Sequence, residues 1–165
     1  MIRTTKTLAV EMNDRRLTVT DALRIATLIA ERLREAHDRG EIHGALSPAS
    51  VALDGDRVQL LPAVEGIVET GYAAPEILQG GRADARSDIF SFGAILLDML
   101  TAARDLENGN AVAERLVKGC LTTSPELRFR RMQNVIVDLR LLAAATRRSA
   151  SGVCMTATVC RNASR

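Results

Sequence analysis

The chain has two histidines, His37 and His43, and they are its candidates for a base that titrates near neutral pH. A histidine base would need a nucleophile beside it, and no Ser or Cys nucleophile motif accompanies His43. A packed, structural role is therefore favoured for His43. His37 falls near the end of a predicted helix, where an imidazole interacts favourably with the helix dipole.

Cysteine chemistry is not indicated either. The three cysteines, Cys120, Cys154 and Cys160, are an odd number without CxxC spacing or supporting histidines. That pattern argues against a metal site and against a disulfide framework, and it favours a reducing, cytoplasmic location. No stretch of the sequence reaches the ~18 apolar residues of a membrane span.

The composition predicts one mainly α-helical domain. The 165 residues are 47% hydrophobic and 25% charged, which is a globular balance for a single domain. Only 2% are aromatic, so the core must be built from Leu, Ile, Val and Ala in runs that suit helices. The net charge of +2 reflects a C-terminal tail rich in arginine, and no basic face with interleaved aromatics suggests nucleic-acid binding.

The first half of the chain predicts one long helix and one hairpin. Thr20 is a candidate N-cap for a helix over about 20–39, which carries an apolar stripe and ends at Gly40. Two short β-compatible runs, 50–53 and 58–61, flank a tight turn. Residues 62–82 contain too many Gly and Pro residues for long regular elements.

The second half predicts a buried central helix. It is expected to begin at Ser87-Asp88 and to continue through Leu100, with apolar residues around nearly its whole circumference. Further helices are predicted over about 111–121 and 131–145. Beyond Arg147 the sequence loses its periodic apolar face and is predicted to be disordered.

Four segments, in order, resemble the second half of a protein kinase. Residues 36–51 are similar to the catalytic loop, 74–76 spell Ala-Pro-Glu, 87–93 are similar to the start of the central helix, and 120–129 carry a late arginine. The chain thus resembles the C-terminal lobe of bacterial-type serine/threonine protein kinases over roughly residues 18 to 143.

The resemblance implies a fold and a division of the chain. We expect a kinase-like C-lobe, a helical bundle around the central helix with one small β-hairpin, and no N-lobe. The implied units are an N-terminal segment over 1–17 left from the inter-lobe region, the C-lobe-like domain over 18–146, and a basic tail over 147–165.

The resemblance also implies two structural contacts. In the family the Ala-Pro-Glu glutamate pairs with the late arginine, so Glu76 and Arg128 are expected to form a bidentate ion pair. Asp88 is expected to accept hydrogen bonds from the His43-Gly44 turn. The alternative is that Glu76 and Arg128 are unrelated surface charges, whose pairing contributes only about 0–1 kcal/mol.

The positions that carry kinase chemistry are substituted. The resemblance places Ala45 at the catalytic base, Ser47 at the lysine, Ser50 at the magnesium-binding asparagine and Pro62 at the aspartate of Asp-Phe-Gly. Fewer than 20 residues precede the first predicted helix, without a Gly-rich loop or a strand lysine. Neither ATP nor magnesium nor another cofactor is expected to bind.

These observations predict a pseudokinase C-lobe that acts as a binding or regulatory module. The expected partner is a protein, either a kinase-like chain or a second copy, with no nucleic acid and no membrane. The alternative is a divergent ATP-dependent kinase or phosphotransferase that uses displaced residues such as Glu65 or Glu69. A third alternative is a gene product without a selected function.

Overall fold

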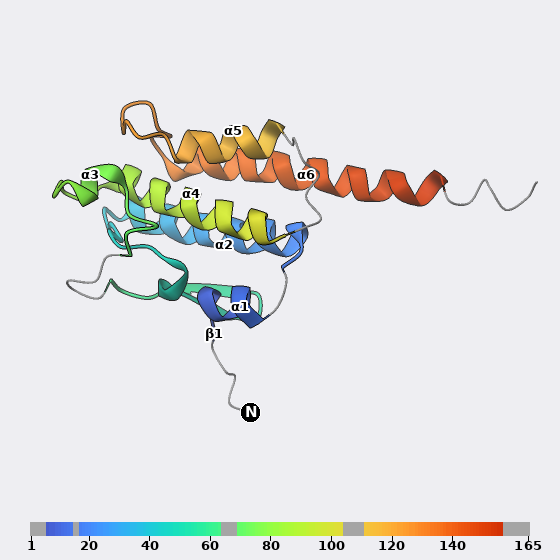
Figure 1. Cartoon of the computed structure of the whole chain (residues 1–165), viewed down its shortest axis with the longest axis horizontal. Coiled ribbons are helices and arrows are strands. Elements are labelled where there is room, and N and C mark those ends of the chain that lie inside the picture. Colours follow the sequence, from blue (N-terminus) through green and yellow to red (C-terminus); the bar gives the residue numbers. More distant parts are fainter. Residues whose placement is uncertain (1–5, 15–16, 64–68, 104–110, 157–165) are drawn as a thin grey trace, which may run out of the picture.

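The computed structural model describes residues 6–14, 17–63, 69–103 and 111–156, with side chains described as far as residue 147. Its described part is mainly helical and has three layers (Figure 1). A small sheet and α1 form one layer, α2 and α4 form the middle layer, and α5 and α6 form the third. The predicted mainly α class is therefore confirmed.

Helix α4, Ala85–Ala102, is the predicted central helix, and it packs against α2 on one side and α5 on the other. Most of its large apolar side chains, including Phe92, Ile95 and Met99, are fully buried. The predicted start at Ser87-Asp88 is too late. Asp84 is the N-cap, because its carboxylate accepts hydrogen bonds from the Arg86 and Ser87 N–H groups.

Helix α2, Val19–Asp38, buries the predicted apolar stripe against α4 and α6. The N-cap is Thr18, and not Thr20 as the sequence pattern suggested. The Thr18 hydroxyl accepts a hydrogen bond from the Asp21 N–H, and the Asp21 carboxylate accepts one from the Thr18 N–H. This capping box satisfies two donors that a start at Thr20 would leave open.

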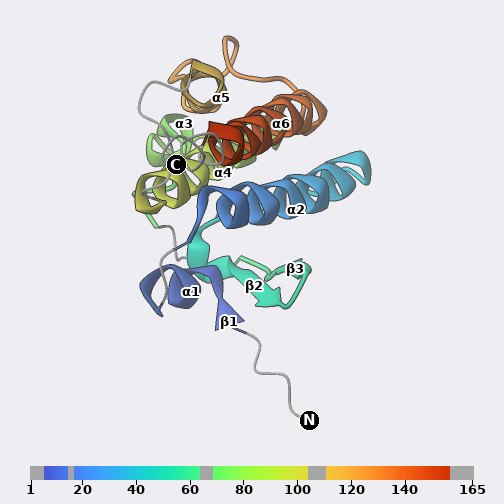
Figure 2. The same cartoon turned by 90° about the vertical axis from the view of Figure 1, so that its right-hand side faces the viewer.

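The sheet has three antiparallel strands in the order β1-β2-β3, and β3 forms one edge (Figure 2). The predicted hairpin is present as β2, Val51–Asp54, and β3, Arg57–Leu60, joined at Gly55 with φ +60°. The prediction missed the third strand. β1, Lys6–Thr7, pairs with β2, and α1, Leu8–Asp14, follows it, so part of the 1–17 segment is folded.

The third layer consists of α5, Ala111–Cys120, and α6, Met132–Thr156. The predicted end of the last helix near residue 145 is wrong, because the helical backbone continues through the start of the expected tail; residues 157–165 lie outside the described residues. Residues 62–82 contain only the short helix α3, Pro75–Leu78, among their described positions. Within the described helices, none combines the length and apolarity needed to cross a membrane.

Candidate functional site

Asp88 holds the turn at the start of the segment that is similar to a catalytic loop. Its side chain is 1% exposed, and its two oxygens accept hydrogen bonds from the His43 N–H at 2.9 Å and the Gly44 N–H at 2.8 Å. Gly44 adopts φ +77°, where other residues are strained. The predicted brace is present, and it joins the first turn of α4 to the segment that follows α2.

His37 adds a contact that the sequence did not predict. Its Nε2 lies 2.9 Å from the same Asp88 Oδ2, and its side chain is 11% exposed. The predicted role of His37 at the helix end named only the dipole. No spacing rule connects positions 37 and 88, because the contact depends on how α2 and α4 cross.

His43 is a structural histidine in its contacts. Its Nε2 lies 2.8 Å from the Leu61 carbonyl oxygen, and its Nδ1 lies 3.4 Å from the Ala45 N–H. The carbonyl requires a donor and the N–H requires an acceptor, so these partners fit the neutral tautomer protonated at Nε2. Both ring nitrogens are therefore engaged by backbone groups, with Leu61 directly preceding Pro62.

The serines of the loop are hydrogen-bonded to neighbouring groups. The Ser50 hydroxyl donates to the Ser47 carbonyl at 2.9 Å and accepts from the Ser47 N–H at 3.0 Å. The Ser47 hydroxyl donates to Glu69 Oε1 at 2.8 Å. Ala45, between this cluster and His43, has no polar side-chain atom. Of the two carboxylates named as displaced candidates, Glu69 is therefore hydrogen-bonded to a loop side chain, whereas Glu65 lies outside the described residues.

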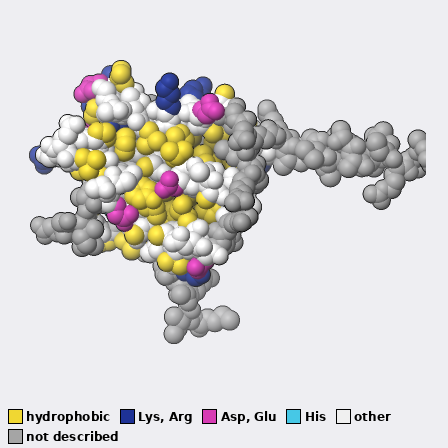
Figure 3. Space-filling view, viewed as in Figure 1, with side chains coloured by type: hydrophobic (Ala, Val, Ile, Leu, Met, Phe, Trp, Pro, Cys, Tyr) yellow, Lys and Arg dark blue, Asp and Glu magenta, His cyan; other side chains and the backbone are white. Residues whose placement is uncertain are grey.

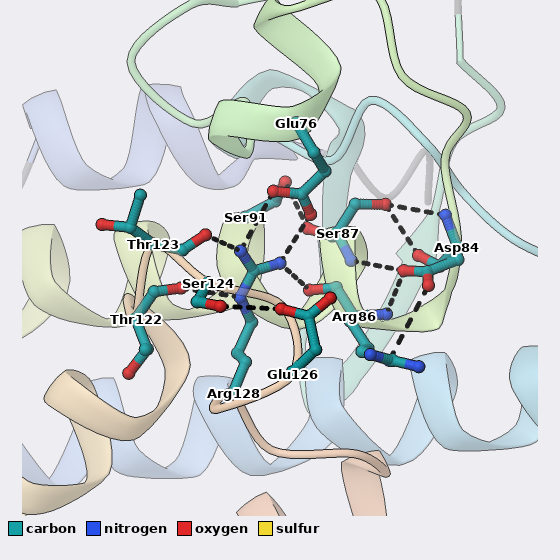
Figure 4. Close-up of polar contacts among 10 residues, drawn as sticks. All are labelled: Glu76, Asp84, Arg86, Ser87, Ser91, Thr122, Thr123, Ser124, Glu126 and Arg128. Atoms are coloured by element: carbon teal, nitrogen blue, oxygen red, sulfur yellow. Dashed lines mark hydrogen bonds and ion pairs between the residues drawn. The ribbon is translucent and has the colours of Figure 1, made fainter.

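Arg128 is the centre of a second polar cluster (Figure 4). Its guanidinium pairs with both carboxylate oxygens of Glu76, at 2.7 and 3.1 Å, as predicted. It also donates to the carbonyl oxygens of Thr122, Arg86 and Thr123. The Arg128 side chain is 0% exposed, so the alternative of two unrelated surface charges is wrong.

The environment of Glu76 favours its charged form. Partial burial raises the pKa of the Glu76 carboxyl, but the hydrogen bonds from Arg128 and from the helix backbone outweigh it, and the net pKa lies below its usual value. Phe90 supports the arginine from below, with its ring centroid 5.1 Å from the guanidinium carbon.

Tyr72 makes a further contact that no sequence motif predicted. Its hydroxyl donates to Asp98 Oδ2 at 2.8 Å, which ties the segment before α3 to α4. Burial, with help from the Asp98 carboxylate, raises the pKa of Tyr72 to about 12, so the hydroxyl stays protonated as the donor.

Among the described residues, no three His, Cys, Asp or Glu side chains gather in a way that could hold a metal ion.

Comparison with known proteins agrees with this geometry. The fold matches the crystal structure of the PknI kinase domain of Mycobacterium tuberculosis with a TM-score of 0.69, at 24% identity, covering 85% of this chain and 63% of that one. The chain is 38% identical over 103 residues to the serine/threonine-protein kinase BIK1 of Arabidopsis thaliana, covering 61% of this chain and 25% of the relative. Over part of its length the chain is homologous to serine/threonine protein kinases.

A second kinase relative comes from the bacteria. The serine/threonine-protein kinase PknJ of M. tuberculosis is 33% identical in an alignment that covers 64% of this chain and 23% of the relative. The kinase-like chain spans about a quarter of the length of the curated relatives it matches. No family profile matches the chain.

Proposed function

We propose that this chain is a catalytically inactive, protein-kinase-like module that acts by binding another protein. The main observation behind the proposal is that the loop side chains at the catalytic positions either bond within the fold or have no polar group. Ser47 and Ser50 direct their hydroxyls into hydrogen bonds within the fold, and Ala45 has no group that could accept a proton. Phosphoryl transfer depends on positioned groups that orient the hydroxyl and hold the metal.

The retained contacts support a scaffold role. Asp88 still holds the loop backbone, and Arg128 still fixes the end of the segment that carries Glu76. These contacts shape the fold without needing a nucleotide. A fold that keeps its architectural ion pairs while the chemistry-bearing positions change is suited to binding.

The surface also favours a binding role. Apolar side chains gather in broad patches over α1, α4 and α5, with few charged side chains between them (Figure 3). Leu97 on α4 and Val10 on α1 are each 42% exposed. Contiguous exposed apolar patches of more than a few hundred Å² usually mark interaction sites.

The alternative function, a divergent kinase with displaced catalytic residues, has one candidate among the described residues, the carboxylate of Glu69. Its Oε1 accepts a hydrogen bond from the Ser47 hydroxyl in the loop, so among the described residues it is the displaced carboxylate that a divergent kinase could use as a base or metal ligand. The two functions therefore make opposite predictions for the full chain and for its Glu69→Gln variant.

The test is phosphate transfer from radiolabelled ATP. The full chain is incubated with Mg²⁺ or Mn²⁺ and a generic protein substrate, beside an active bacterial kinase as positive control. We expect no label on the chain or the substrate, and no shift of melting temperature on adding the metal–nucleotide complex. Transfer that disappears in Glu69→Gln would replace the proposal with the divergent kinase.

A further inference from the structure

Three helix ends and the loop before α6 surround a hollow of about 540 Å³. The end of α2 and the starts of α4 and α6 lie together at one end of the molecule, on the left in Figure 1. The residues that line the hollow include Arg34, His37 and Asp38 of α2, Ala85 of α4, and Arg130 and Arg131 of the loop.

The lining of this hollow carries more positive than negative charge. Its arginines are Arg34, Arg130 and Arg131, and the carboxylate among its lining residues is Asp38. That carboxylate is already engaged, because Arg34 donates to its Oδ2 at 3.1 Å. Three arginines against one carboxylate leave an excess of two positive charges, which belongs to Arg130 and Arg131.

Arg130 and Arg131 differ from most arginines in the part of the chain that the structure describes. Most of the others, including Arg34 and Arg128, have a carboxylate oxygen within 4.0 Å, whereas neither of these two pairs with a described carboxylate. Both residues are exposed and both line the hollow. Their guanidinium donors are therefore available to a ligand.

Two neighbouring features modify this charge. Helix α6 begins at Met132, which also lines the hollow, and the N-terminal end of a helix carries partial positive charge. Asp88 contacts His37 from outside the lining, but its side chain is 1% exposed and its oxygens already accept hydrogen bonds from His37 and the loop backbone. The hollow therefore stays positive towards a ligand.

The charge and the size of the hollow together favour a phosphate monoester on a larger molecule. Such a group carries about −1.5 to −2 charges at pH 7 and three strong acceptor oxygens, which match two unpaired guanidiniums better than a single carboxylate does. The volume is within the range that holds ligands much larger than one phosphate. A nucleic acid needs a basic surface along several phosphates, whereas this cluster is confined to one end of the molecule.

We propose that this hollow binds a phosphorylated serine or threonine of a partner protein, with Arg130 and Arg131 donating to the phosphate oxygens. Arginine clusters are a recurrent means of recognising phosphorylated segments, and the planar fork of a guanidinium fits two phosphate oxygens at once. This inference rests on the proposed binding role, and it specifies the surface and the kind of segment.

The test measures peptide binding to the full chain. Immobilised degenerate peptides with a central phosphoserine or phosphothreonine are screened first, and the strongest sequences are titrated by calorimetry with and without the phosphate. We expect a Kd below about 1 mM for the phosphorylated form and binding at least tenfold weaker for the unphosphorylated form. Failure of every phosphopeptide to reach that affinity, or equal binding of both forms, overturns the proposal.

Matched variants locate the binding site on the chain. Arg130→Gln and Arg131→Gln should each weaken phosphopeptide binding by about tenfold, while Arg57→Gln, which removes an exposed arginine outside the hollow, should not. Asp38→Asn should strengthen binding by about threefold, because it removes the carboxylate of the lining and frees Arg34. All four residues are exposed, so the fold should tolerate these changes. Equal weakening by Arg57→Gln, or weaker binding by Asp38→Asn, would contradict the assignment.

The source of the phosphate is tested with two further probes. Inorganic phosphate should bind at least tenfold more weakly than the best phosphopeptide, because it leaves most of the hollow unfilled. Equal affinity for inorganic phosphate would identify an anion site without a protein partner. Tighter binding of a short single-stranded RNA would identify a nucleic-acid site, and either result would overturn the proposed partner.

The outcome is independent of the phosphate-transfer test, because Ala45, Ser47 and Glu69 are not among the residues that line the hollow. Label transfer would refute the inactive function and leave the phosphopeptide result standing. Absence of both transfer and phosphopeptide binding would retain an inactive module but overturn the assignment of this hollow as its binding site.

Discussion

Arg128 shows how one side chain can join three separate parts of the chain. A guanidinium has five N–H donors in a fixed fork, and Arg128 has an acceptor for each in Glu76, Arg86 and the Thr122-Thr123 backbone. This complete set of partners makes burial of the charge tolerable. It also means that lysine, with three donors on a point charge, cannot replace it.

The two partners of this ion pair should respond unequally to substitution. Arg128→Ala is expected to lower the free energy of unfolding by about 3–5 kcal/mol, because it leaves the Glu76 charge and three carbonyl groups without their donor. Glu76→Gln should cost only about 1–2 kcal/mol, because Arg128 keeps its carbonyl acceptors. Urea unfolding of the variants measures both values, and equal losses would show that the carbonyl contacts contribute nothing.

The pH dependence of stability should report the Glu76 carboxylate. Its pKa is lower in the folded state than the ordinary value of 4.5, so the ion pair stabilises the fold above that pH. The contribution is lost as the pH falls through the folded-state pKa. The stability difference between wild type and Glu76→Gln should therefore shrink when urea unfolding is repeated below pH 4.5; a constant difference would contradict the ion-pair origin.

At the scale of elements, Asp88 couples two helices to a loop. Its position in the first turn of α4 places its carboxylate against the His43-Gly44 turn and against His37 of α2. The carboxylate is buried, and it accepts hydrogen bonds from the His43 and Gly44 N–H groups and from His37 Nε2. Loss of this residue would leave those partly buried donors without their acceptor.

Asp88→Ala is expected to destabilise the protein by about 3 kcal/mol, the combined effect of three partly buried donors that lose their acceptor. Hydrogen exchange of the His43 and Gly44 amides should accelerate more than exchange within α2. Ser91→Ala, one turn further along α4, removes only a hydroxyl that bonds its own helix and serves as the control. If Ser91→Ala lowered the free energy of unfolding as much as Asp88→Ala, the hydrogen bonds of Asp88 would have no special role in stability.

The contact between α4 and α5 requires a glycine. A Cβ on Gly93 would lie 2.4 Å from the Cβ of Cys120, so the two helices meet backbone to side chain. Helix propensity alone would make Gly93→Ala stabilising by about 1 kcal/mol.

We expect the opposite sign for Gly93→Ala, a loss of about 1–3 kcal/mol, because overpacking forces the helices apart. Combining it with Cys120→Gly removes the clashing atom, so the two substitutions should be less costly together than the sum of each alone. Thermal or urea unfolding of the four proteins gives this coupling, and strict additivity would contradict the close approach.

At the scale of the whole molecule, the layers differ in how they are held. The middle layer lies between two others, and α4 is buried along most of its length (Figure 1). The sheet packs against the middle layer through one side, where β3 contacts α2, and its first strand has only two residues. Stability should therefore be lowest at the sheet edge and highest in α4.

Native-state hydrogen exchange should reveal this gradient. Amides around Ile95 and Leu96 in α4 are expected to exchange only through global unfolding, and those of β1 through smaller openings. Exchange followed residue by residue by NMR at several urea concentrations gives the two free energies. Equal values would mean that sheet and helices unfold as one unit.

The sequence by itself determined the elements whose causes are local. The apolar stripe of α2, the all-round apolar α4 and the turn at Gly55 all follow from side-chain period and turn chemistry. The Glu76–Arg128 pair and the Asp88 brace could be predicted from the resemblance, because the motifs that carry them kept their residues.

Only the tertiary structure decided the contacts between distant positions. The His37–Asp88 and Ser47–Glu69 hydrogen bonds and the pairing of β1 with β2 have no local signature. Helix starts at Thr18 and Asp84 depended on which side chain could reach the first free N–H groups. Local sequence sets periodicity and propensity, but partner choice depends on how elements pack, and that is fixed by the whole fold.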